Sequence, residues 1–318
     1  MTHFCPHYPK PRTKRASIWS LFFSARHSWL DALYERSYRM HMGEVHLPGL
    51  ALYMVNEPSL VRRVLNEEQA LFPKSKLLGQ ALEPLLGASI FTTNGAQWKR
   101  QRDMMNPAFA QARVQVAFTA MRAAAEDMIA RLEKISNGAP YDMELEMTHV
   151  TADIIFRTIF STPLAGEDAH RVFAAFARFQ ALAPRLMLPS LYGVRWLVWP
   201  WDLWRSRRAA HEIRSLLERL IRARHDALQR GEGAAPTDIL SAFMAARDPQ
   251  TGEPFSLGEL VDQVAMLFLA GHETSASALT WACHLLANDA KVQERVHTEV
   301  METLGQRTPE HGDIKALT

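Results

Sequence analysis

The chain has 318 residues, 47% hydrophobic and 22% charged, which excludes a disordered protein and favours one large or two ordinary globular domains. A net charge of +2 is too small to favour nucleic acid as a partner. Two cysteines exclude a disulfide framework, and no apolar run approaches the ~18–20 residues of a membrane-spanning helix, so we expect a cytoplasmic protein.

The N-terminal stretch predicts a loose tail followed by a helix. Residues 1–17 are rich in proline and basic residues and contain no acidic residue, which predicts a disordered basic tail. A basic arm on a membrane or a transit peptide is the alternative. Apolar residues then recur at helical spacing and predict a helix that packs on the protein, although the same face suits a lipid surface. These residues are Ile18, Phe22, Ala25, Trp29 and Leu33.

A β-hairpin is the clearest short-range signal. Residues 43–47 and 50–55 read as strands, and Pro48-Gly49 between them is a turn signal. We expect Asn56 to cap the next helix. Residues 73–97 are apolar but broken repeatedly by proline and glycine, which predicts an irregular segment that lines something. The small β-containing region spans about residues 40–95.

The rest of the chain is predicted to be helical. Ser256 and Glu259 form a capping box ahead of a long helix of ~30 residues, or ~45 Å at ~1.5 Å per residue. A last helix over 289–304 stops at Gly305. The fold class is therefore mostly α with a small N-terminal β-hairpin, and the helical body spans about residues 96–305. The 3.6-residue period recurs over residues 112–135, 144–160, 168–182 and 204–230.

Half of the eight tryptophans lie between residues 196 and 204, directly before three arginines. Trp beside Arg suits a boundary between an apolar phase and water. Two interpretations stay open: a helix junction held by aromatic packing, or a lip that touches a membrane or guides an apolar substrate inward. The residues are Trp196, Trp199, Trp201 and Trp204, followed by Arg205, Arg207 and Arg208.

The long helix carries polar residues in an apolar run, and such residues cost free energy in a buried helix unless they are used. His272-Glu273 would open a zinc-protease motif, but that motif needs a second histidine at the position of Ala276. Glu273 beside Thr274 suits proton transfer through water, and the Thr274 hydroxyl is expected to bond the carbonyl one turn earlier. A strip of small residues permits the close approach of a flat group, although tight helix packing uses the same residues. The strip comprises Ala270, Gly271, Thr274, Ser277 and Ala278.

Two motifs resemble the cytochrome P-450 family of haem-thiolate monooxygenases, and so does the order of an N-terminal hairpin, an irregular apolar segment and a helical body. The run Ala270-Gly271-His272-Glu273-Thr274 on a long helix is similar to the family's oxygen-activation motif. The run Trp98-Lys99-Arg100-Gln101-Arg102, followed by Asn106-Pro107-Ala108-Phe109, is similar to its Trp-x-x-x-Arg helix. The resemblance covers about residues 40–305 and implies the P-450 fold, as a single domain over residues 18–318 that is incomplete at its C-terminus.

The Trp98–Arg102 motif, by this resemblance, binds the cofactor haem b. Trp98 and Arg102 would bind a haem propionate, since the guanidinium fork suits a carboxylate. Lys99 and Arg100 are expected to be solvated, and they are candidates for docking an acidic electron donor. The donor would be a ferredoxin or a flavoprotein reductase.

The Ala270–Thr274 motif, by the same resemblance, serves the reaction with O2. Ala270 and Gly271 would pass close to the haem, and Glu273 and Thr274 would supply the protons for O–O cleavage. The substrate would be a small apolar molecule. A peripheral membrane contact through residues 196–204 is the alternative to a purely cytoplasmic setting. The substrate pocket would be lined by Phe91, Leu267 and residues from 77–91 and 176–188.

The family's axial cysteine and the Glu-x-x-Arg helix before it have no counterpart in this chain. Cys283 lies on the long helix and Cys5 in the tail, so neither is assigned as a metal ligand. We therefore expect the 318-residue chain alone to bind haem poorly and to be inactive. The alternative function is a truncated helical binding or scaffold remnant. A Glu-x-x-Arg and a Cys loop encoded in frame after codon 318 would decide for the enzyme.

Overall fold

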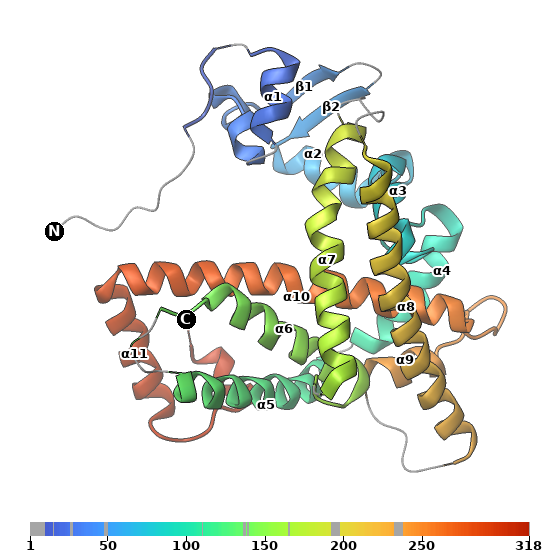
Figure 1. Ribbon diagram of the computed structural model, residues 1–318, viewed down its shortest axis with the longest axis vertical. Helices are drawn as coiled ribbons and strands as arrows, with labels where there is room; N and C mark the ends of the chain where they lie inside the picture. The colour runs from blue at the N-terminus through green and yellow to red at the C-terminus, as the bar shows by residue number, and fades with distance from the viewer. Residues whose placement is uncertain are drawn as a thin grey trace. The chain divides into compact units, whose positions relative to one another are not determined.

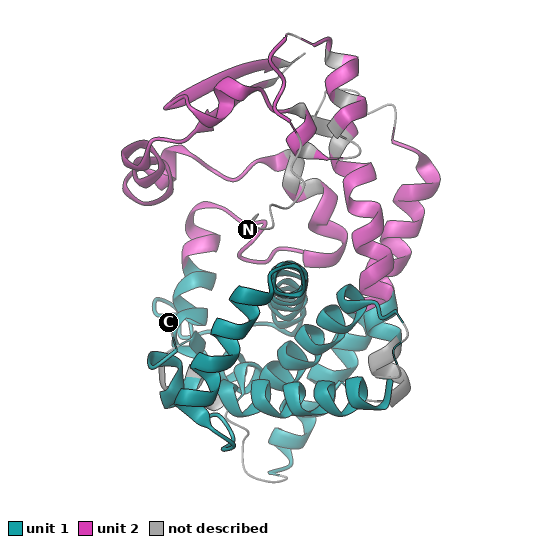
Figure 2. Cartoon of the chain, turned by 90° about the vertical axis from the view of Figure 1, so that its left-hand side faces the viewer, with its two compact units in different colours: residues 1–6, 100–174, 214–318 teal, residues 7–99, 175–213 magenta. Residues whose placement is uncertain are grey.

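The computed structural model describes residues 10–14, 16–25, 28–47, 50–109, 111–135, 138, 140–164, 166–191, 198–231 and 238–317. These residues are mostly helical with a two-stranded antiparallel sheet, as the sequence predicts (Figure 1). They form two compact units (Figure 2). Unit 1 contains residues 100–174 and 214–318, and unit 2 contains residues 175–213 and the described residues before 100.

The helix predicted over residues 18–33 is shorter than expected. Helix α1 ends at Ala25, and a separate 3-10 turn follows, because the Ser28 hydroxyl accepts a hydrogen bond from the amide of Leu30 and starts a new element. Arg12, inside the stretch expected to be loose, donates to the carbonyl of Asp31 at 2.7 Å. The elements are α1 (Ile18–Ala25), η1 (Trp29–Ala32) and η2 (Glu35–Tyr38).

The predicted hairpin is confirmed. Strand β1 (Met42–Leu47) pairs with β2 (Leu50–Val55) in the register Met42↔Val55 to Leu47↔Leu50. The predicted turn at Pro48-Gly49 lies outside the described residues. The expected cap is wrong by one residue: Glu57 is the N-cap of α2 (Pro58–Arg62). Asn56 instead donates its amide hydrogens to the carbonyls of Ser37 and Met40, which ties the hairpin to η2.

The segment over residues 73–97, expected to be irregular, contains helix α3. Pro84 lies in the last turn of α3, and Leu85 and Leu86 beside it are fully buried in unit 2. Pro84 has no N–H to donate to the carbonyl of Gln80, yet α3 continues for two residues beyond it, so the expectation of an irregular segment is wrong here. The elements here are η3 (Arg63–Glu67), η4 (Gln69–Leu71) and α3 (Lys76–Leu86).

Three helices contain the chain positions at which one unit ends and the other begins. Helix α7 continues through Pro184 and Pro189, beyond the predicted end at residue 182. Helix α8 begins earlier than predicted, so two of the clustered tryptophans lie within its first turns. The bounds are α4 (Gly95–Met105), α7 (Gly166–Leu191) and α8 (Pro200–Gln229).

Unit 1 is built around helix α10. The predicted capping box is confirmed, since Ser256 Oγ accepts from the Glu259 amide and Glu259 Oε2 accepts from the Ser256 amide. Helix α6 lies along α10, and the apolar face of α10 is buried (Figure 1). Within the described residues, no helix combines the length and apolarity that a membrane-spanning segment needs. The elements are η5 (Asn106–Phe109), α5 (Gln111–Ile135), α6 (Met143–Phe160), α9 (Ile239–Ala245), α10 (Leu257–Asn288), α11 (Ala290–Leu304) and η7 (His311–Lys315).

Candidate active site

Helix α10 has two faces at its centre. Ala270, Thr274, Ser277 and Ala278 are exposed, whereas Ala276 is buried against α5 and α6. Glu273 is also exposed. The expectation that these polar residues interrupt a buried helix is therefore wrong, because they face outward from unit 1. The exposed face keeps the small side chains that the sequence placed there.

The predicted hydrogen bond of Thr274 is confirmed. Its Oγ1 donates to the carbonyl of Ala270, one turn earlier, at 2.9 Å. The hydroxyl oxygen still has lone pairs that accept a hydrogen bond from water. Glu273 is the residue before Thr274 in the helix, and both residues are exposed. A carboxylate and a hydroxyl are therefore neighbours on the surface of α10. This pair suits proton transfer between solvent and a group bound over Ala270.

Gly271 is half-buried and lies against α6. A Cβ built on Gly271 would lie 2.6 Å from Ile155 Cδ1 and 3.0 Å from Ile155 Cγ1 of helix α6. Of the two readings of the small-residue strip, tight helix packing therefore applies at Gly271, which lets α6 approach α10 closely. Its predicted contact with haem stays a prediction, and only its backbone is available for it.

The centre of α10 is fixed to α6 at His272. This imidazole is 1% exposed, and its Nδ1–H donates to the carbonyl of Phe268 at 2.7 Å. The hydroxyl of Thr151, also buried, donates to the carbonyl of His272 at 3.0 Å. Burial lowers the pKa of His272 below its usual 6.5. The hydrogen bond to Phe268 and the charge of Glu273 raise this pKa, but they offset the effect of burial only in part. The neutral imidazole is thus a structural support of the site.

Helix α4 carries the other predicted cofactor residues. Trp98 and Arg102 are four residues apart in α4, so they lie one turn apart on one side. Arg102 is exposed and Trp98 half-buried. The ammonium of Lys74 lies 5.3 Å from the centre of the Trp98 ring and donates to the carbonyl of Thr93 at 2.8 Å. Burial lowers the pKa of Lys74. Lys74 therefore orients the indole of Trp98, which the sequence did not indicate.

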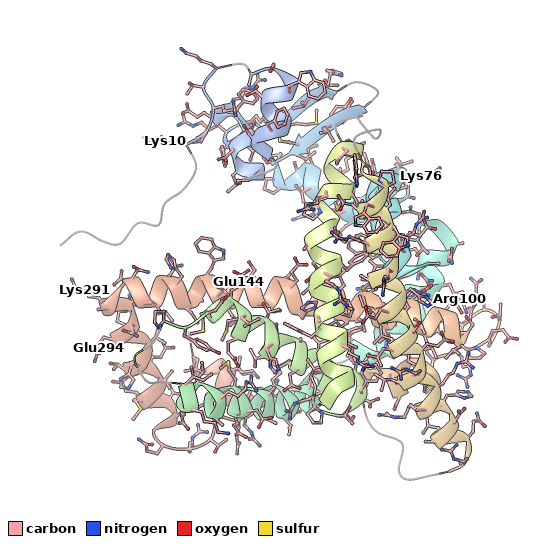
Figure 3. All side chains as sticks on the ribbon, viewed as in Figure 1. Lys10, Lys76, Arg100, Glu144, Lys291 and Glu294 are labelled. Atoms are coloured by element: carbon pink, nitrogen blue, oxygen red, sulfur yellow. The ribbon has the colours of Figure 1, made fainter. Side chains whose placement is uncertain are left out.

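Arg100 is not solvated, contrary to the prediction. Its Nε donates to Asp248 at 3.0 Å, and its Nη1 donates to Glu259, the residue that also caps α10. Figure 3 labels Arg100 at the N-terminal end of α10. Although burial opposes the charge, the two carboxylates raise the pKa of Arg100. No spacing in the sequence joins position 100 to positions 248 and 259, so sequence patterns alone did not reveal this link.

Cys283 points away from the exposed face. It lies nine residues after Thr274, about two and a half turns, which is the opposite side of the helix. Its side chain packs against Ala124, Met147 and Val150. Among the described residues, no group of three or more His, Cys, Asp or Glu is placed to hold a metal ion. Cys5 lies outside the described residues.

The predicted substrate-pocket residues differ in exposure. Phe91 in unit 2 is 41% exposed, and Leu267 in unit 1 is half-buried. Phe176 and Phe179 are fully buried and belong to the core of unit 2. The substrate pocket stays a prediction for all four residues.

The model of the family Cytochrome P450 matches residues 9–318. The chain belongs to the cytochrome P450 family. Cyclooctat-9-en-7-ol 5-monooxygenase of Streptomyces melanosporofaciens is 33% identical over 282 residues, which cover 86% of this chain and 57% of that protein. Pentalenene oxygenase of Streptomyces avermitilis is 30% identical over 279 residues, covering 86% and 59%.

A solved structure shows the same fold. The crystal structure of the cytochrome P450DA heme domain matches with a TM-score of 0.72 at 22% identity, and the match covers 95% of this chain and 62% of that chain. The chain thus spans about three-fifths of the length of the relatives that it matches.

Proposed function

We propose that this chain contributes the oxygen-activation and haem-binding helices of a haem-dependent monooxygenase. The whole protein would oxidise a small apolar substrate with O2 and electrons from a ferredoxin or a flavoprotein reductase. The observation that carries the proposal is the exposed face of α10, where Thr274 bonds the Ala270 carbonyl at 2.9 Å beside the exposed carboxylate of Glu273. The names of two relatives, a monooxygenase and an oxygenase, support the class of reaction.

The described residues fit one face and the rim of a haem. The small side chains of Ala270 and Thr274 leave room for a flat ring over α10, and the exposed guanidinium of Arg102 suits a propionate. They do not supply the thiolate that the family uses at iron, because Cys283 faces α5 and α6. The described residues therefore suit the binding of the haem propionates and the supply of protons, and they leave the iron ligand unassigned.

The residues of α10 have defined tasks in this proposal. Haem, when bound, supplies the oxidising chemistry of the reaction with dioxygen. Glu273 exchanges protons with solvent at its carboxylate, since it is exposed. Thr274 passes a proton at Oγ1, which donates to Ala270 at rest and is free to turn toward a nearer acceptor. His272 keeps the helix in place from the buried side.

Docking of the electron donor rests on Lys99 in this proposal. Lys99 is exposed on α4, whereas the charge of Arg100 is shared with Asp248 and Glu259. In the whole protein, K99E is expected to slow reduction and to leave substrate affinity unchanged. An unchanged reduction rate would remove Lys99 from the docking surface. Contact of the Trp196–Trp204 region with a membrane is also proposed, and Trp196 in this region lies outside the described residues.

A haem titration of the 318-residue chain tests the cofactor side. R102Q is expected to weaken the Soret change on binding, because a propionate loses a charge-assisted partner. K99Q removes the same charge three residues away on α4 and is the matched control. Equal affinities of the two variants would refute the role of Arg102.

The ferrous–CO spectrum tests the iron ligand. We expect the chain alone to bind haem weakly and to show no Soret band at the thiolate position, because Cys283 faces α5 and α6. A thiolate-type band would overturn this expectation. The alternative function, a helical binding or scaffold remnant, is favoured if haem causes no Soret change at any concentration in the wild type.

A further inference from the structure

An open pocket of about 660 Å³ lies in the N-terminal part of unit 2. Its volume falls within the range of pockets that bind small organic molecules, roughly 300–1,000 Å³. The residues to which the proposed function gives a task do not line it. Its lining residues include Arg12, Tyr34, Glu35, Arg36, Arg39 and Met40.

Hydrogen bonds to the backbone hold the walls of this pocket together. The amide of Arg12 donates to the carbonyl of Leu33 at 3.1 Å, and the amide of Glu35 donates to the carbonyl of Arg12 at 3.0 Å. The phenol oxygen of Tyr34 accepts a hydrogen bond from the amide of Ala16 at 3.1 Å. The N-terminal segment is therefore fixed to the two 3-10 turns η1 and η2, so the pocket is formed before a ligand binds.

Arg12 is a half-buried cation that is held in place by neutral groups. Its guanidinium donates to the carbonyl of Asp31 at 2.7 Å, to the hydroxyl of Ser24 at 2.5 Å and to that of Ser20 at 3.5 Å. None of these acceptors is a carboxylate, so the contacts orient the guanidinium without neutralising its charge. Because a guanidinium has five N–H donors, two of them remain for an anion.

The other two arginines of the pocket are exposed. The guanidinium of Arg36 lies 5.4 Å from the centre of the Tyr34 ring, and within the described residues no carboxylate pairs with it. Arg39 pairs with Glu35 at 3.2 Å, but their side chains are 80% and 53% exposed, and such a pair is weak and opens easily. Three arginines against one glutamate give the pocket a positive potential.

We infer that this pocket binds a soluble organic phosphate, a molecule with a phosphoryl group on an apolar or aromatic body. Guanidinium forks match phosphate oxygens in two-point contacts. The pocket has room for more than a phosphoryl group, and the Tyr34 ring and the Met40 side chain offer apolar surface to the body of the ligand. The phenol of Tyr34 keeps its own hydrogen as a further donor. The inference depends neither on haem nor on the proposed monooxygenase activity.

Isothermal titration calorimetry of the 318-residue chain with phenyl phosphate tests the inference. We expect saturable binding of one phenyl phosphate per chain. Inorganic phosphate, which has no apolar body, and phenol, which has no charge, are each expected to bind about tenfold more weakly or worse, the loss of one strong contact.

Three charge variants locate the binding in the pocket. R36Q is expected to weaken the binding of phenyl phosphate about tenfold, because a charge-assisted contact is lost. E35Q is expected to tighten it about threefold, because Arg39 is released from an exposed pair; a variant that merely loosens the fold would not gain affinity. R62Q removes an exposed charge of α2 outside the pocket and is the matched control, expected to bind within about twofold of the wild type. Far-UV circular dichroism checks that each variant is folded.

Several results would overturn the inference. Absence of binding heat with phenyl phosphate would remove the site, and equal losses in R36Q and R62Q would reduce it to the general charge of the surface. Inorganic phosphate that binds as tightly as phenyl phosphate would make the pocket a simple anion site and overturn the organic ligand. Binding to vesicles that contain phosphatidic acid, without binding of phenyl phosphate, would assign the anion to a lipid headgroup and overturn a soluble ligand.

Discussion

The close approach of α6 to α10 at Gly271 predicts an unusual response to a single methyl group. In most exposed or open helix positions, Gly→Ala stabilises a protein by about 1 kcal/mol, because alanine is the better helix former. At Gly271 the new Cβ would lie 2.6 Å from Ile155 Cδ1. Cδ1 is the flexible end of that side chain, but Cγ1 at 3.0 Å must move with it.

The two effects have opposite signs. Repacking of an overfilled contact costs about 1–3 kcal/mol, so we take about 2 kcal/mol for the displacement of Ile155. After subtraction of about 1 kcal/mol for helix propensity, G271A is expected to lower the free energy of unfolding by about 1 kcal/mol. In the I155A background the obstacle is gone, and the same substitution is expected to raise it by about 1 kcal/mol.

Urea denaturation of the four proteins of this double-mutant cycle measures the sign reversal. The matched control is G258A, because a Cβ on Gly258 of the same helix meets nothing within 4 Å; it is expected to be neutral or stabilising. If G271A stabilises the wild type as much as it stabilises I155A, the close contact of the two helices is refuted.

The remaining predictions concern charge. R100A is expected to lower the free energy of unfolding by about 2 kcal/mol in urea titrations, between the values for exposed and buried pairs, because Arg100 holds two carboxylates and is 26% exposed. R222A, which breaks an exposed pair on α8, should change it by less than about 0.5 kcal/mol; equal losses would contradict the role of Arg100. Burial lowers the pKa of His272 in the folded protein. Below about pH 6.5 the imidazole is therefore protonated in the unfolded chain while it is still neutral in the folded protein, which favours unfolding. Stability is therefore full above that pH and falls as the pH drops below it. H272N should flatten this slope.

The sequence predicted the elements whose signals are local. The Ser256–Glu259 capping box and the apolar period located α10, and two short strands around the Pro48-Gly49 turn signal located the hairpin. The Thr274 bond to Ala270 followed from helix geometry alone. These features depend on residues within about one turn or one hairpin of each other, so the pattern along the chain contains them.

Features that depend on distant residues were missed or wrong. Arg100 looked solvated because its partners lie about 150 positions away in the chain. For Gly271 the sequence left two readings open, a flat group or a packed helix, because spacing alone does not say which side of a helix meets Ile155. Helix α3 was missed because Pro84 was read as a breaker, although it stands where the helix is about to end.

The exposed face of α10 is the central claim, and blocking it tests the claim most directly. A270F places a ring over the small-residue face, and A287F places the same ring at an exposed alanine near the end of α10. Ferric haem is titrated into each variant and followed by the Soret change. The account predicts that A270F loses haem affinity at least tenfold, by about 1.4 kcal/mol, while A287F binds as the wild type does. If A270F and A287F bind haem with equal affinity, the placement of haem on this face is contradicted.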